Sequence, residues 1–384
     1  MTLYLDCNAT TPIDPRVLAE VQRCFVDEVG NAGSPHEFGL RAKDIVHAAR
    51  ERIATVIAAK RNEIVFTSGA TESNNLAIFG LMEHGIAAGR RHIVSTQIEH
   101  KAVLEPLMSL RNRGFEVTLV PPEPNGRVAA EAVVDAVRPD TLLVSVMHVN
   151  NETGVIQPVA AVADELMTSH DAFLHVDAAQ GFGKDLDPLR HPRIDLMSIS
   201  SHKIFGPAGV GALMVRRHRD RTIPLAPLMH GGGQELGLRP GTLPVALISG
   251  FGLAAKLSAD EVDSRRAVCR KIREQLIAGL APLQPCYHGD EELSLPHVVS
   301  VSFPGVDADG VIELLAGVAA VSTGSACTSV CATSSHVLAA MGVAQPELDG
   351  AVRISWSHRT GASQLNEQLP QIVERLSCIA VRQS

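Results

Sequence analysis

The chain has 384 residues, 45% of them hydrophobic, which is enough for two domains that each bury a core. Its formal net charge is −8 and only 3% of its residues are aromatic. Such a chain lacks the basic face and stacking platform that bind nucleic acid directly. No stretch approaches about 18 uncharged apolar residues and no signal region opens the chain, so we expect neither a membrane span nor secretion. Seven scattered cysteines favour free thiols in the cytoplasm over disulfides.

The first half of the chain alternates helical and extended patterns. Apolar residues at helical spacing from Ala42 to Ile57 precede a series of short apolar runs. The runs span residues 63–66, 92–95, 115–120, 141–147, 172–176, 194–199 and 210–215. Most are separated by enough chain for a crossover helix. This predicts an α/β fold with a mostly parallel seven-stranded sheet and helices on both faces, a fold that binds ligands at the carboxyl ends of its strands.

The pattern changes after Pro244. We expect a long helix (262–280), a strand (298–302), a helix near 311–315, a loop that holds Cys327, a strand (351–355) and a last helix broken at Pro370. These elements predict a smaller α+β domain, joined by the first dozen residues. The expected division is therefore a large domain of residues 14–250 and a small domain of residues 1–13 and 251–384.

A small-residue turn lies between a strand and a helix at residues 67–71. Backbone N–H groups at the start of a helix bind anions, and the hydroxyl of Thr71 can add a further donor. An ordinary helix cap, with Ser68 or Thr71 as the N-cap residue, explains the pattern equally well.

Three more side chains that could take part in catalysis follow predicted strands. Asp177 ends an apolar run, where a carboxylate needs a cationic partner such as a protonated pyridine nitrogen, although a metal or a helix cap would also fit. Lys203 follows Ser200 and His202, and partial burial would make its amine available for a Schiff base. His100 lies at another strand end. Because these strand ends meet at one edge of the sheet, we expect one shared site.

In chain order, these motifs resemble those of the NifS/IscS-like cysteine desulfurases, which are class V, fold-type I enzymes that depend on pyridoxal 5'-phosphate. The matching stretches are residues 67–75 (TSGATESNN), 99–101 (EHK), 149–154 (VNNETG), 176–180 (VDAAQ), 201–207 (SHKIFGP) and 324–329 (GSACTS). The resemblance covers nearly the whole chain and implies that the large domain binds the cofactor. The length of the Cys327 loop is similar to that of the long-loop group.

The resemblance implies a role for each matching residue. Lys203 would hold the cofactor as a Schiff base and then take the substrate's Cα proton, while Asp177 would pair with the ring nitrogen and His100 would stack on the ring. The remaining implied cofactor contacts are Ala70, Thr71, Ser200 and His202 at the phosphate, Gln180 and Asn151 at the ring oxygen or the substrate, and Thr242 at the phosphate of a neighbouring subunit. The last contact implies a homodimer with shared active sites.

The sulfur chemistry is expected at Cys327. Its loop has small polar residues and no large apolar anchors, which favours an exposed thiolate nucleophile over a chance cysteine in a linker. By the resemblance, L-cysteine is the substrate. His100 would handle its thiol proton and Arg353, between two core-facing residues, would bind its carboxylate. The products would be alanine and a Cys327 persulfide for a sulfur-acceptor protein. We expect Cys331 to be idle.

The sequence leaves three other functions possible: two enzyme activities and one thiol- or metal-binding module. A selenocysteine lyase or a class V aminotransferase would keep Lys203 and Asp177 but would not need Cys327. A thiol or metal module built from Cys327, Cys331 and His336 lacks the four ligands of a structural zinc site, so we expect no metal. The resemblance implies an acceptor in iron–sulfur cluster assembly or in nucleic-acid thiolation, as in the specialised desulfurases of DNA phosphorothioation, and the sequence does not decide between the two.

Overall fold

The computed structural model describes residues 2–217, 223–324 and 334–380. Its largest sheet contains seven strands: β2 (Ile64–Thr67), β3 (His92–Thr96), β4 (Glu116–Val120), β5 (Thr141–Met147), β6 (Phe173–Asp177), β7 (Leu196–Ser200) and β8 (Gly211–Val215). Their spatial order is β2-β8-β7-β6-β5-β3-β4. Only β8 pairs antiparallel with its neighbours, so the other six strands all run in one direction. The expected mostly parallel seven-stranded sheet is confirmed.

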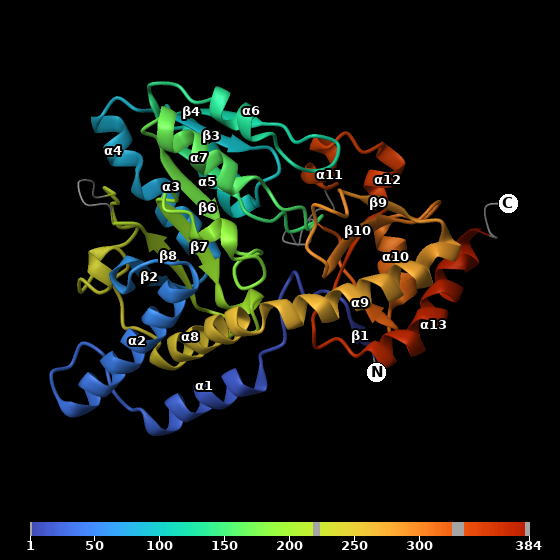
Figure 1. The fold of residues 1–384 in the computed structure, drawn as a ribbon, viewed down its shortest axis with the longest axis horizontal. Coiled ribbons are helices and arrows are strands. Elements are labelled where there is room, and N and C mark those ends of the chain that lie inside the picture. Colours follow the sequence, from blue (N-terminus) through green and yellow to red (C-terminus); the bar gives the residue numbers. More distant parts are fainter. Residues whose placement is uncertain (1, 218–222, 325–333, 381–384) are drawn as a thin grey trace.

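Helices cover both faces of this sheet (Figure 1). They are α1 (Pro15–Asp27), α2 (Glu37–Val56), α3 (Ala70–Gly80), α4 (Met82–Ala87), α5 (Lys101–Arg111), α6 (Ala130–Asp135), α7 (Val159–Ser169) and α8 (Val245–Asp260). Neighbouring strand residues enter different cores: Val144 packs with residues of α2, α6, α7 and α8, and Leu143 packs with residues of α3 and α5. Burial on both faces explains why the central strands are apolar throughout.

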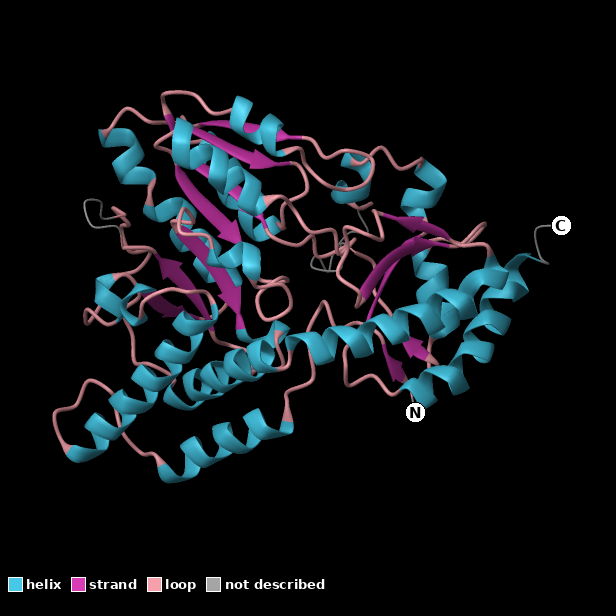
Figure 2. Cartoon of the chain, viewed as in Figure 1, coloured by secondary structure: helices cyan, strands magenta, loops and turns pink. Residues whose placement is uncertain are grey.

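A smaller antiparallel sheet stands beside the first (Figure 2). Its strands are β9 (Cys286–His288), β10 (Val298–Ser302) and β12 (Ala351–Ser355), in the order β12-β10-β9. The helices around it are α9 (Val262–Leu280), α10 (Ala308–Leu315), α11 (His336–Ala340), α12 (Gln345–Asp349) and α13 (Ala362–Ala380). The chain start packs against this part, because β1 (Leu3–Tyr4) pairs with β11 (Ala319–Ala320) and Leu3 and Leu5 enter its core.

The last helix corrects one expectation. The sequence predicts a break at Pro370, but α13 continues through this residue. An interior proline costs a helix about 3 kcal/mol. The apolar stripe of α13, formed by Leu365, Leu369, Ile372 and Leu376, is buried in the core of the small sheet, and each such side chain contributes about 1.5–3 kcal/mol. Burial of the stripe therefore outweighs the lost backbone hydrogen bond.

Helix α8 crosses the expected domain boundary at residue 250. Phe251, Ala254 and Ala255 in its second half pack in the core of the large sheet, whereas Cys269 and Ile272 of α9 pack in the core of the small one. In Figure 2 the two helices follow one another and link the two halves of the molecule. We therefore propose that the large domain extends to about Asp260, with the small domain starting at α9.

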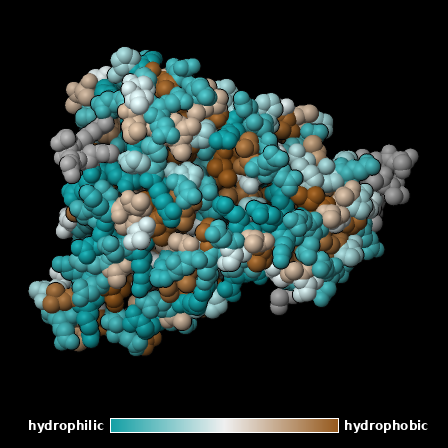
Figure 3. All heavy atoms as spheres, viewed as in Figure 1, coloured by the Kyte–Doolittle hydropathy of each residue, from teal (hydrophilic) through white to brown (hydrophobic). Residues whose placement is uncertain are grey.

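Hydrophilic residues predominate on the face shown in Figure 3, and apolar residues form separate groups among them. In the described part of the chain, every helix is too short or too polar to cross a membrane.

Candidate active site

A cavity of about 430 Å³ opens where the six codirectional strands end, beside the small sheet. The predicted site residues that line it are Ala70, Thr71, His100, Asn151, Asp177, Gln180, Ser200, His202, Lys203 and Arg353. They come from loops after five different strands and from β12, so their meeting point depends on the fold and not on nearness in sequence. The expected convergence is confirmed, and the individual roles stay proposals.

The start of α3 forms one wall of the cavity. Its N-cap residue is Gly69, which has no side chain to accept a hydrogen bond from the first turn. Neither Ser68 nor Thr71 serves as the N-cap residue, so the ordinary-cap explanation is wrong at this helix. The N-terminal N–H groups and the positive end of the helix dipole are thus placed to bind an anion. Ser200 and His202, after β7, line the same cavity.

Asp177 is a buried carboxylate at the end of β6. Its Oδ2 accepts a hydrogen bond from Nδ2 of Asn74 at 2.7 Å, and its Oδ1 accepts one from the backbone N–H of Ala179 at 2.9 Å. Two donors from two elements hold the carboxylate in one orientation. Such a group stabilises a cation placed in the cavity, including a protonated ring nitrogen.

A second carboxyl group, that of Glu99, is close enough to Asp177 for the two groups to interact electrostatically. Glu99 is fully buried, and its Oε1 accepts hydrogen bonds from the Thr96 hydroxyl at 2.9 Å and from the Met147 backbone N–H at 2.7 Å. Burial, with a smaller contribution from the charge of Asp177, raises the pKa of Glu99 to about 8. Glu99 is therefore mostly protonated at neutral pH.

Lys203 occupies a short turn directly after β7 and is partly buried, as a Schiff-base lysine requires. Its Nζ donates to the backbone carbonyl oxygen of Ala9 at 2.7 Å and to that of Asn8. The N-terminal segment thus holds the amine in the cavity that Asp177 also lines. Phe205, two residues later, has a φ of 67°, a strained value for a residue with a side chain.

His100 is the N-cap residue of α5. Its Nδ1 accepts a hydrogen bond from the backbone N–H of Ala102 at 3.0 Å, which places the proton of the neutral ring on Nε2. His202 contacts the Thr10 hydroxyl at 3.1 Å, and its pKa falls to about 4, chiefly through burial and also through the charges of Lys203 and Lys184. His202 is therefore a neutral polar group near pH 7.

Arg353 is buried on β12 and points away from the small core, as predicted from its neighbours. Its Nη2 donates to Asp6 Oδ1 at 2.8 Å and to the Ser322 hydroxyl at 2.9 Å, and its Nη1 donates to the Asn151 carbonyl oxygen at 3.1 Å. Its buried Nε has no hydrogen-bond partner among the described residues. Because Arg353 also lines the cavity, its positive charge is suited to an anionic substrate group.

Comparison with known proteins agrees with this geometry. The model of the aminotransferase class-V family matches residues 3–367. The chain belongs to the class-V aminotransferase family. It is 42% identical over 371 residues to cysteine desulfurase IscS of Aeromonas hydrophila, covering 95% of this chain and 90% of that protein. A solved NifS-like protein superposes with a TM-score of 0.91 at 38% identity, over 98% of this chain and 100% of that one. DndA of Streptomyces lividans superposes with a TM-score of 0.81 at 48% identity, over 91% and 98%.

One described residue that the sequence predicted for the site, Thr242, is not among those that line the cavity. Thr242 is exposed on the surface of this single chain, so its expected contact with a neighbouring subunit stays a prediction. Cys327 and Cys331 lie outside the described residues. Gly324, three positions before Cys327, lines the cavity, so the described chain reaches the site just before the cysteine expected of this class-V family member.

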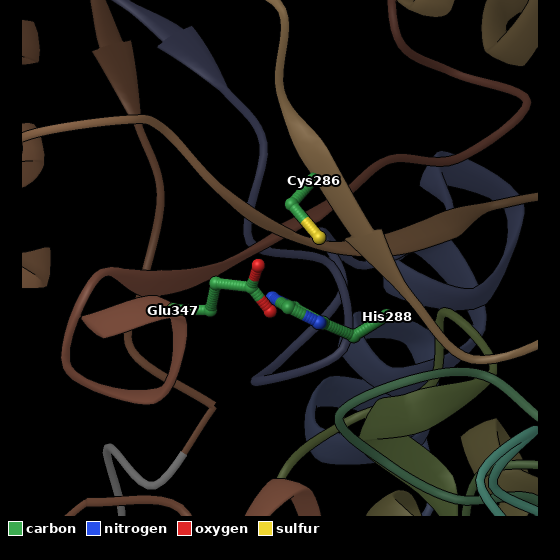
Figure 4. Close-up of side chains that lie close together, drawn as sticks. All are labelled: Cys286, His288 and Glu347. Atoms are coloured by element: carbon green, nitrogen blue, oxygen red, sulfur yellow. The ribbon is translucent and has the colours of Figure 1, made fainter. Parts of the chain in front are cut away.

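A possible ligand cluster lies away from the cavity, on the small sheet. Cys286, His288 and Glu347 point toward one another (Figure 4), with candidate ligand atoms within 4.8 Å of one another. Nε2 of His288 lies 2.6 Å from the Ser302 hydroxyl, which itself donates to the Glu347 carbonyl oxygen at 2.5 Å. Nε2 therefore donates to Ser302 and is occupied. We assign this cluster no metal-binding role.

Three residues that support the site, Asn8, Ala9 and Asn74, are not predicted from the sequence. The carbonyl groups of Asn8 and Ala9 carry no sequence signal, because every residue has one. Asn74 had a signal: it follows Thr71 by three positions, so both lie on the same face of the helix that starts at the cavity.

Proposed function

We propose that this chain is a cysteine desulfurase that converts L-cysteine to L-alanine with pyridoxal 5'-phosphate. The thiolate of Cys327 would take the substrate's sulfur as a persulfide, and the C–S bond of the substrate would break. The substrate Cβ would gain one of the two thiol protons, and the other would remain with the persulfide. The observation that carries the proposal is that the amine of Lys203, the carboxylate of Asp177 and the anion-binding start of α3 line one cavity. The relatives named cysteine desulfurase support it.

The residues present fit the cofactor. The start of α3, with Ser200 and His202, offers donors for a phosphate, and Asp177 offers a buried negative charge for a ring nitrogen. Oδ1 of Asn74, buried beside Asp177, has no partner among the described residues. When bound, the cofactor supplies an electron sink for the carbanion at the substrate Cα.

The chain's own residues supply binding and proton transfer. Lys203 would hold the cofactor and take the Cα proton, because its amine lines the cavity and would be free to act as a base once the substrate amine replaced it. His100, with its ring proton on Nε2, would exchange a proton with the substrate thiol. Arg353 would bind the substrate carboxylate and Asn151 would orient the substrate beside it.

We propose that the enzyme works as a homodimer. Several large apolar side chains on and after α1 and on α2 are exposed in the single chain, including Phe25 (68%), Val26 (79%) and Val29 (70%), with Phe38 and Leu40 also exposed. Several exposed large apolar side chains on neighbouring elements are typical of a surface that a protein partner covers. Thr242 would reach the phosphate in the neighbouring subunit, so a mixture of Lys203→Ala and Thr242→Ala chains should regain activity that neither has alone.

The acceptor of the sulfur would be a protein in the cytoplasm. The net charge of −8 argues that any nucleic acid is handled by that protein rather than by this chain. The similarity to DndA makes an acceptor of a nucleic-acid thiolation pathway one candidate, and the similarity to IscS makes an iron–sulfur scaffold the other.

The test supplies the holoenzyme with cysteine and a reductant and measures alanine and sulfide. Equal amounts of both are expected, and Cys327→Ser should abolish them. Pyruvate in place of alanine would show elimination and refute the proposal. Alanine production that persists in Cys327→Ser would instead indicate a selenocysteine-lyase type of reaction, and 3-mercaptopyruvate formed when a keto-acid acceptor is added would indicate an aminotransferase.

A further inference from the structure

A second lysine lies directly behind the active-site cavity. Lys184 closes the turn that follows β6 and lines a separate cavity of about 50 Å³ between the two sheets. Its side chain also reaches the active-site wall, because Nζ donates to Oε1 of Gln180 at 3.3 Å. Lys184 therefore connects the interior of the domain junction with a residue of the cofactor cavity, and the proposed mechanism does not use it.

This contact fixes the orientation of the Gln180 amide. A protonated lysine can only donate a hydrogen bond, so the atom of Gln180 that it contacts is the oxygen. The amide nitrogen then faces the other way and donates to the Asn8 carbonyl oxygen at 2.9 Å. That same carbonyl oxygen accepts from Nζ of Lys203. A chain of hydrogen bonds thus runs from Lys184 through Gln180 and Asn8 to the proposed cofactor lysine.

The turn that carries Lys184 is held rigidly. Gly181 and Gly183 have no room for a side chain: a Cβ on Gly181 would lie 1.9 Å from Nδ1 of His148, and one on Gly183 would lie 2.8 Å from Cβ of Ser258. Arg266 of α9 donates to the Lys184 carbonyl oxygen at 2.7 Å. The backbone therefore holds the Lys184 side chain in one position, which a residue that positions Gln180 requires.

The surroundings of Lys184 are mostly cationic or neutral. The titratable and charged groups that line its cavity or act on its charge are Cys7, Lys203, Arg265, Arg266, Cys269, His297, Arg353 and His358. Burial, followed by the charge of Lys203, lowers the pKa of Lys184 to about 7. A buried amine that costs this much to charge needs a compensating interaction, and the oxygen of the Gln180 side chain accepts a hydrogen bond from it.

We propose that Lys184 is a positioning residue, which holds the Gln180 amide in one orientation in the wall of the cavity, with its oxygen toward Lys184 and its NH₂ group toward Asn8, so that the amide would be ready to contact a bound cofactor. The inference rests on the proposed function, because it assumes that a pyridoxal ring occupies the cavity. It assigns Lys184 no contact with the substrate or the cofactor.

The test is a double-mutant cycle with Lys184→Met, Gln180→Leu and the double variant. The readouts are the affinity of the cofactor-free protein for pyridoxal phosphate and the pH dependence of the bound cofactor's visible absorption. Loss of one buried charge-assisted hydrogen bond should weaken the affinity about tenfold in Lys184→Met. In the Gln180→Leu background the same change should have less than about a twofold effect, since nothing remains to be positioned.

Two control variants and a check of folding accompany the cycle. Lys184→Arg, which keeps a donor, should recover most of the affinity, and Lys256→Met on the exposed face of α8 should match the wild type. Methionine removes a buried amine without leaving a void, so Lys184→Met should fold, and thermal melting checks this. An equal loss of affinity in both backgrounds, or none in either, would overturn the inference. A protein that binds the cofactor but makes no alanine from cysteine would refute the proposed function alone.

Discussion

Replacing Glu99 by glutamine should change how the stability of the protein depends on pH. Glutamine has the shape of a protonated glutamate and can accept the same hydrogen bonds from Thr96 and Met147. Its amide cannot ionise. If Glu99 is protonated in the folded enzyme, the variant should fold normally and should keep its cofactor.

The size and sign follow from the raised pKa. Glu99 has a pKa of about 8 in the folded protein against an ordinary value of 4.5. Between these values the folded state keeps a proton that the unfolded state releases, so this group lowers stability as pH rises, by about 1.4 kcal/mol per pH unit. From about pH 5.5 to 7.5 the loss is therefore about 3 kcal/mol, and it levels off above pH 8.

The assay is denaturant unfolding of the wild type and of Glu99→Gln at several pH values, at one protein concentration. Because all other groups titrate alike in both proteins, the difference between their free energies of unfolding isolates Glu99. The variant should gain stability relative to the wild type as pH rises. Glu105→Gln, at an exposed position on the following helix, should show no such trend. A wild-type-to-variant difference that is constant from pH 5.5 to 7.5 would refute the reasoning.

Three further substitutions test other parts of the structure. Arg353→Lys keeps the charge but loses the planar fork, so steady-state alanine production should show KM for cysteine raised at least about tenfold, with a smaller change in kcat. Asn74→Ala removes a donor to the Asp177 carboxylate at 2.7 Å, and titration should show cofactor affinity weakened about tenfold or more. Pro370→Ala restores a backbone N–H inside α13, and thermal unfolding should show a gain of about 1–3 kcal/mol; a loss would mean that the proline is needed for packing.

The convergence of the site residues could be predicted from the order of motifs along the chain. Each motif follows an apolar run, and strands that run in one direction bring their carboxyl ends to one edge. Residues as distant as Thr71, His100, Asp177 and Lys203 therefore had to meet. The alternation of runs and helical patterns also determined the sheet and its two covered faces.

Only the tertiary structure decided how these groups are held. The carbonyl group that holds the amine of Lys203 belongs to Asn8, 195 residues earlier, and no local pattern announces it. No local pattern announces the contact of Lys184 with Gln180 or the burial that raises the pKa of Glu99. Nor does one announce that α13 passes through Pro370, which it does because its apolar stripe is buried. Periodicity and propensity report the preferences of neighbouring residues, whereas burial, charge and hydrogen bonding at these positions depend on segments that meet only after folding.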